Sequence, residues 1–89
     1  MKTIDECYDI ITALNEEAHQ MAWDSWIRAD EEDDESLRED ASLEQQEYFI
    51  DLFDDLDEET QAAVFHHCRE NDAIRSDFEC WYGSEGWKL

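Results

Sequence analysis

The sequence predicts an all-α fold, a small single domain in which three or four helices form a bundle. The chain has 89 residues, of which 42% are hydrophobic, so it can build one small core but no second domain. It contains no Pro, and its only glycines are Gly83 and Gly86, whereas hairpin turns usually need Gly. The alternation of apolar and polar residues that strands require is also missing. These observations favour helices, in one domain that covers residues 1–89.

The first helical region is expected over residues 3–28, as one long helix or as two with a bend. Thr3 and Glu6 have the spacing of a capping box, which predicts that a helix begins there. Asn15 is the weak point at which a bend is expected. Apolar residues follow at helical spacing: Ile4, Cys7, Tyr8, Ile11, Leu14, Ala18, Met21 and Ala22.

Residues 30–41 are expected to form an exposed acidic connector. The segment has the sequence DEEDDESLREDA, in which Leu37 is the one large apolar residue. Its carboxylates repel one another, which disfavours a packed helix. Ser42 and Gln45 then have the spacing of a second capping box, so the next helix is predicted to begin at this point.

This next helix is expected to carry acids on one face and apolar residues on the other. The acidic face contains Glu44, Glu47, Asp51, Asp54, Asp55 and Glu58. The apolar face contains Leu43, Phe49, Ile50, Phe53 and Leu56. Like charges one turn apart destabilise a helix by about 0.2–0.5 kcal/mol per pair, so a face that served solubility alone would include Lys. The pattern therefore indicates that the negative potential itself is needed.

Two shorter helices and a tail complete the prediction. Asp57 can cap a third helix, whose buried stripe would be Ala62, Val64, Phe65 and Cys68. The pair Asn71 and Asp72 is typical of a turn that caps a new helix. This fourth helix would bury Ile74, Phe78, Trp81 and Tyr82 and end at Gly83. Residues 84–89 are expected to form a tail from which Trp87 folds back.

The charge of the chain narrows its expected partners. Twenty-seven Asp and Glu against six Lys and Arg give a net charge of −21. Sixteen of these acids lie between residues 30 and 59, where Arg38 is the one base. Such a surface repels nucleic acid and anionic membranes, so neither is an expected direct partner. It also disfavours a reactive thiolate, and no catalytic residue or enzymatic activity is predicted.

No metal site or cofactor is predicted. An EF-hand loop needs Gly at its sixth position and Glu at its twelfth, but a loop that starts at Asp30 has Glu35 and Ala41 there. His66, His67 and Cys68 are adjacent, which does not match the spacing of zinc ligands.

The cysteines and tryptophans give three further expectations. The chain has an odd number of cysteines, Cys7, Cys68 and Cys80, and their spacing matches no paired motif, so free thiols are expected. The sequence does not start with a basic and apolar signal region, so a cytoplasmic location is expected. No apolar run approaches the ~20 residues of a membrane span. Trp23 and Trp26 cannot both lie centrally on the apolar stripe, which leaves open packing within the monomer, an exposed partner anchor or a homodimer contact.

A small acidic helical chain of this kind resembles the DNA-mimic inhibitors that phages and mobile elements encode. The resemblance covers size, charge and the row of carboxylates. It implies that the chain occupies the basic nucleic-acid-binding channel of a restriction enzyme, a CRISPR effector or another DNA-handling protein. An acidic binding module, such as an antitoxin or a chaperone of a basic protein, is the alternative. In either case the expected partner-binding residues are Asp30, Glu31, Glu32, Asp33, Asp34, Glu35, Glu39, Asp40, Glu44, Glu47, Asp51, Asp54, Asp55 and Glu58.

Overall fold

The structure is a computed structural model that describes residues 2–82. It contains five helices in this range: α1 (Ile4–Met21), α2 (Trp23–Glu32), α3 (Glu35–Asp54), α4 (Glu58–Glu70) and α5 (Asp72–Tyr82). No strand occurs among the described residues. The predicted all-α class is therefore confirmed. The structure has five helices because the helical region predicted over residues 3–28 is divided at Ala22 into α1 and α2.

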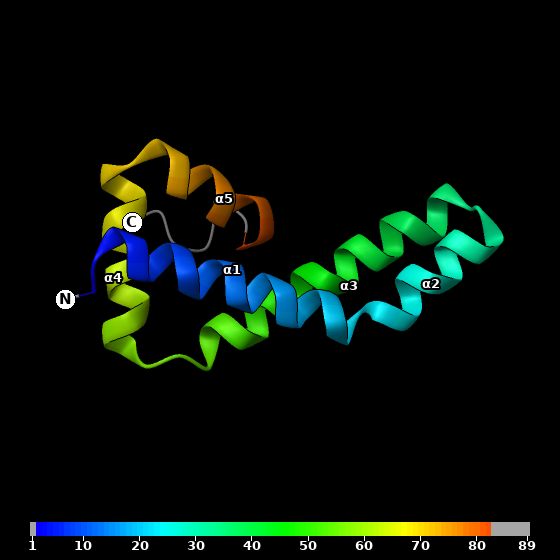
Figure 1. The fold of residues 1–89 in the computed structure, drawn as a ribbon, viewed down its shortest axis with the longest axis horizontal. Helices are drawn as coiled ribbons and strands as arrows, with labels where there is room; N and C mark the ends of the chain where they lie inside the picture. The colour runs from blue at the N-terminus through cyan, green and yellow to red at the C-terminus, as the bar shows by residue number, and fades with distance from the viewer. Residues whose placement is uncertain (1, 83–89) are drawn as a thin grey trace.

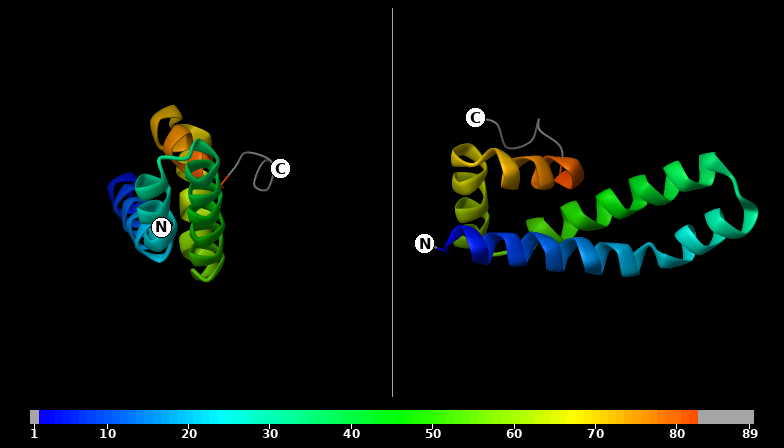
Figure 2. Two further views of the ribbon diagram at one scale, coloured as in Figure 1. Left: turned by 90° about the vertical axis from the view of Figure 1, so that its right-hand side faces the viewer. Right: turned by 45° about the horizontal axis from the view of Figure 1, so that its top comes forward.

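The molecule is a rod with dimensions of 45 × 19 × 19 Å. α1 and α2 follow one another along the rod, and α3 returns beside both of them (Figure 1). α4 crosses one end, and α5 runs back alongside α1 and α3 (Figure 2). We call residues 23–45, the hairpin that projects beyond α5, the arm, and the remainder the head.

The hydrophobic core lies in the head, where α1, α3, α4 and α5 meet. Phe49, Phe53 and Phe78 are fully buried, and the rings of Phe53 and Phe78 are 5.0 Å apart in a T-shaped arrangement. Such aromatic pairs contribute about 0.5–1.5 kcal/mol beyond the burial of their area. The complete cluster consists of Cys7, Ile11, Leu14, Ala18, Phe49, Phe53, Ala63, Val64, Cys68, Ile74 and Phe78.

The arm has a different interior, built from small side chains. Ala29 and Ala41 are fully buried, and Gln45 is 4% exposed. Alanine allows two helices to approach closely but buries little apolar area, so the hairpin remains thin.

α1 begins as predicted but ends at a different bend. The Thr3 and Glu6 side chains each accept a hydrogen bond from the backbone N–H of the other residue, at 3.2 and 3.1 Å, which confirms the capping box. The bend is at Ala22, where φ is −94° and ψ is 9°, and the prediction of a weak point at Asn15 is wrong. Asn15 stays helical within α1, and its side-chain oxygen accepts a hydrogen bond of 2.9 Å from Gln45.

Residues 30–41 are mostly exposed, as predicted, but the prediction that they form a connector is wrong because most of them are helical. Residues 30–32 end α2, Asp33 takes a left-handed conformation with φ of 48°, and Asp34 caps α3 by accepting a 2.9 Å hydrogen bond from the Ser36 amide. The mutual repulsion of these acids is outweighed because α2 and α3 pack on each other, and tertiary packing supplies most helical stability.

Because α3 begins at Glu35, the capping box predicted at Ser42 and Gln45 does not exist. The buried face of α3 is Ala41, Gln45, Phe49 and Phe53, spaced four residues apart. Leu43, which was expected on that face, is 57% exposed, whereas Ile50 and Leu56 are half-buried.

The start of α4 agrees with the prediction. The Asp57 side chain caps this helix and accepts a hydrogen bond of 3.4 Å from the Thr60 amide. Of the expected stripe, Val64 and Cys68 are buried, Phe65 is half-buried, and Ala62 is exposed. Thr60 and Ala63 are buried in addition.

The start of α5 also agrees with the prediction. The Asn71 side chain caps this helix and accepts a hydrogen bond of 2.9 Å from the Ala73 amide. Ile74 and Phe78 are buried, and Trp81 and Tyr82 are half-buried. The predicted stop at Gly83 and the predicted tail with Trp87 lie outside the described residues.

Candidate partner-binding surface

The candidate surface consists of carboxylates that helices α2 and α3 hold outward. Thirteen of the fourteen predicted partner-binding residues are exposed, and Glu44 is half-buried. Eight surround the tip of the arm: Asp30, Glu31, Glu32, Asp33, Asp34, Glu35, Glu39 and Asp40. Glu47, Asp51 and Asp54 continue along α3 towards the head.

A row of four carboxylates runs along the outer face of α3. We define the α3 row as Asp40, Glu47, Asp51 and Asp54, which follow each other at intervals of seven, four and three residues. With 3.6 residues per turn, these intervals keep all four on one face, opposite the buried face at Ala41 to Phe53. All four side chains are exposed. The backbone of a single helix therefore fixes the spacing of their charges.

The row is shorter than the sequence predicted. Asp55 is the C-cap residue of α3, and Glu58 is the first residue of α4, which crosses the end of the rod. Both are exposed, but the turn between the two helices takes Glu58 off the face of α3. The prediction that Glu58 shares this face is therefore wrong.

Glu44 has a structural role within the arm. Its carboxylate accepts hydrogen bonds from the Ser25 hydroxyl of α2 and, at 3.2 Å, from the Tyr48 hydroxyl of α3. The hydrogen bond to this carboxylate, together with its charge, raises the pKa of Tyr48. Glu44 therefore joins α2 to α3, a structural role that its assignment as a partner-binding residue did not include.

The cations of the arm offset only part of its charge. Arg28 lies 2.8 Å from Glu32, and Arg38 lies 2.9 Å from Asp33 and 4.0 Å from Asp30. These exposed pairs contribute little to stability. The arm contains ten carboxylates and these two Arg, which leaves a net charge of −8. Within residues 2–82, no ion pair involves the α3 row.

Exposed apolar side chains lie close to these carboxylates. Trp23 is 45% and Ile27 37% exposed on α2, and Met21 is 46% exposed beside the bend. Trp26 is half-buried and donates its indole N–H to Gln45 at 2.9 Å. The structure thus settles which tryptophan is the exposed one, which the periodicity of the sequence left open.

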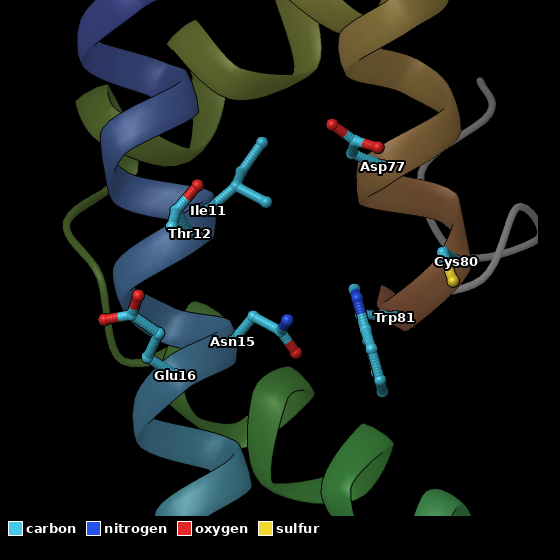
Figure 3. A pocket seen from close by; sticks show the side chains of 7 residues that line it. All are labelled: Ile11, Thr12, Asn15, Glu16, Asp77, Cys80 and Trp81. Atoms are coloured by element: carbon cyan, nitrogen blue, oxygen red, sulfur yellow. The ribbon is translucent and has the colours of Figure 1, made fainter.

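An open cleft of about 300 Å³ lies between α1 and α5 (Figure 3). The side chain of Ile11 and that of Asn15 project into it, and Trp81 stands opposite Asn15. The Cys80 thiol and the carboxylates of Glu16 and Asp77 also line it. Within residues 2–82, the cleft is lined by Ile11, Thr12, Asn15, Glu16, Asp77, Cys80 and Trp81.

The remaining potential reactive groups are buried or scattered. Burial raises the pKa of the Cys7 thiol and raises the pKa of the Cys68 thiol to about 12, so both thiols are protonated at neutral pH. Among residues 2–82, no three His, Cys, Asp or Glu side chains are placed to hold a metal ion. None of the described helices combines the length and the apolar character needed to cross a membrane.

Comparison of the chain with protein-family models, with curated proteins and with solved structures gave no match.

Proposed function

We propose that this chain is a DNA-mimic inhibitor, which occupies the basic nucleic-acid-binding channel of a DNA-handling protein or complex. Restriction enzymes and CRISPR effectors are the targets that we favour. The observation that carries the proposal is the α3 row, an array of exposed carboxylates that one helix holds at fixed spacing.

The linear charge density of the rod is close to that of DNA. Residues 2–82 contain 26 Asp and Glu and five Lys and Arg, a net charge of −21. Spread over the 45 Å long axis, this corresponds to about one negative charge per 2 Å. Duplex DNA carries one per about 1.7 Å of its axis. A cleft lined by Lys and Arg would therefore meet a similar density of negative charge on either molecule.

The dimensions of the rod support the same function. The 20 residues of α3 rise about 30 Å, which is close to one turn of B-DNA at about 34–36 Å. The arm is the thinner part of the rod, since it lacks α4 and α5 (Figure 2). A thin acidic hairpin suits entry into a channel that admits a nucleic-acid strand or duplex, and Glu47, Asp51 and Asp54 follow the arm along the same helix into the head.

The charge also has an energetic cost that solubility alone does not explain. Asp51 and Asp54 lie in the last turn of α3, which contains no basic residue, and Asp55 caps it. Negative charge at a helix C-terminus is unfavourable because the helix dipole is negative there. A protein that only needed to remain in solution could place Lys at these positions. Their retention supports a requirement for the negative surface.

The decisive test is inhibition of DNA cleavage by restriction enzymes and CRISPR effector nucleases. For a susceptible nuclease, E47Q/D51N/D54N should raise the concentration for half-inhibition about tenfold or more, which corresponds to 1.4 kcal/mol or more of binding free energy. The matched control D9N/E16Q/E17Q removes three exposed charges from α1 and should stay close to wild type. Equal inhibition by both triple variants would contradict the proposal.

The alternative, an acidic module that neutralises a toxin or chaperones a basic protein, is favoured by the exposed Trp23 and Ile27, because aromatic side chains are enriched at protein interfaces. Competition separates the two functions. Duplex DNA should release the partner of a DNA mimic, whereas the partner of an antitoxin that does not itself bind DNA should stay bound.

A further inference from the structure

Trp23 and Ile27 form a small exposed apolar face on α2, which we call the α2 anchor. They are four residues apart, so they lie one turn from each other on the same side of the helix. Their exposures are 45% and 37%. Scattered single apolar residues are normal on protein surfaces, but a Trp and an Ile that adjoin are a candidate contact point.

The surrounding structure holds the Trp23 side chain in place. The His19 ring packs edge-on against Trp23 at 5.5 Å and against Trp26 at 6.0 Å. Trp26 is in turn fixed by its hydrogen bond of 2.9 Å to the buried Gln45. An aromatic side chain that is ordered before binding loses less conformational entropy when a partner covers it.

The charges around the α2 anchor determine what can cover it. Asp24, Asp30 and Glu31 are exposed and follow Trp23 by one, seven and eight residues, which places them around the same side of α2. A second copy of this chain would bring two molecules with a net charge of −21 together at these acids, and nucleic acid would also be repelled. A partner with Lys and Arg around an apolar patch is complementary.

We infer that the α2 anchor binds an apolar patch within the basic surface of a target protein, and that it supplies the selectivity that carboxylates alone cannot give. The inference rests on the proposed function and extends it, because it adds an apolar contact to the charge pairing between the carboxylates and the basic channel. The occupant is thus a protein with a basic surface that has an apolar centre.

Two probes separate charge from apolar contact. Poly-L-lysine offers charge alone, whereas a helical peptide of Lys and Leu with one Leu face offers charge around an apolar stripe. W23A and I27A should each weaken binding to the Lys and Leu peptide about tenfold, as expected for an interface anchor, and should leave binding to poly-L-lysine almost unchanged. Fluorescence anisotropy of labelled probes measures both affinities, and circular dichroism checks that the helices remain.

L43A is the matched control, because Leu43 is 57% exposed yet lies outside the α2 anchor. It is two residues from Ala41 and two from Gln45, both buried against α2, so it points away from α2. Leu43 lies on the face of the α3 row, three residues after Asp40 and four before Glu47, so L43A tests whether an apolar contact there accounts for binding. L43A should bind both probes like wild type, because the α2 anchor supplies the apolar contact. The two anchor variants give independent readings, because I27A leaves the aromatic cluster at His19 intact.

Equal losses for both probes, no loss for either probe, or a loss in L43A as large as that in W23A would overturn the inference. Self-association of the wild-type chain in analytical ultracentrifugation that W23A abolishes would overturn it in favour of a second copy. None of these outcomes changes the result expected for E47Q/D51N/D54N in the nuclease assay. Conversely, full inhibition by that variant would reject DNA mimicry while leaving the W23A measurement interpretable.

Discussion

The indole N–H of Trp26 donates a hydrogen bond of 2.9 Å to the side-chain oxygen of Gln45. The amide nitrogen of Gln45 donates in turn to Asn15 Oδ1, also at 2.9 Å. This buried side chain of α3 is therefore joined to both α1 and α2, on either side of the bend at Ala22. The network fixes the position of the arm relative to the head.

Replacing Gln45 with Leu should destabilise the protein by about 1 kcal/mol or more, because the half-buried indole N–H of Trp26 and the half-buried Asn15 Oδ1 both lose their hydrogen-bond partner. Urea unfolding followed by circular dichroism measures this change. Q20L, at an exposed position of α1, is the control and should stay within about 0.5 kcal/mol of wild type. A Q45L variant as stable as wild type would show that the network contributes nothing.

Neutralising the acids at the end of α3 should stabilise the protein. D51N/D54N should raise the free energy of unfolding by about 0.5–1 kcal/mol, because the carboxylates face the negative end of the helix dipole. Asn at position 54 can still accept the hydrogen bond that Tyr82 donates to Asp54. Salt screens exposed charges over about 10 Å at 0.1 M, so the gain should shrink at high ionic strength. A loss of stability at low salt would contradict the cost that we assign to these charges.

Asp57 should contribute stability that depends on pH. The hydrogen bond from the Thr60 hydroxyl lowers the pKa of the Asp57 carboxyl in the folded state. Its contribution is therefore present above the ordinary pKa, about 3.9, and is lost as the pH falls through the lowered value. D57A should lower Tm at pH 7, and the difference from wild type should narrow below about pH 4.

The substitution T60V provides the companion measurement, since it removes the hydroxyl donor at nearly constant volume. NMR titration should then place the pKa of Asp57 higher in T60V than in wild type. The same pKa in both proteins would show that the Thr60 hydroxyl does not stabilise the carboxylate.

The three cysteines should react at very different rates. Cys80 is exposed, whereas Cys7 and Cys68 are fully buried, and burial raises the pKa of Cys68 to about 12. Because the thiolate is the reactive form, a maleimide should modify one thiol quickly in the native protein and all three in urea. C80S should remove the fast phase, and mass spectrometry counts the modified sites. Fast modification of Cys68 in native protein would show that the core opens readily.

The helix starts that the sequence predicts correctly are those that local chemistry decides. Thr3, Asp57 and Asn71 each accept a hydrogen bond from an amide two or three residues further on, so a short window of sequence contains the whole interaction. The large aromatic residues of the core, Phe49 and Phe53, were also recognisable from their spacing.

The start of α3 depended on residues far away in the chain. The sequence predicts that Gln45 belongs to a capping box, because no residue within four positions reveals that Trp26 and Asn15 enclose it. It places Glu44 in the exposed row for the same reason, since the partner Ser25 is 19 residues away. Contacts between α2 and α3 thus decided which polar residues are buried, and the periodicity of one helix does not encode such contacts.

The alanines of the arm have a consequence for engineering. Ala29 and Ala41 are completely buried, and their small side chains determine how closely α2 and α3 approach each other. The larger side chain of A41L would increase the distance between α2 and α3 without replacing any acidic residue. The width and the charge of the arm can therefore be varied separately. A series of increasingly large side chains at Ala41 would measure the width of the channel that receives the arm.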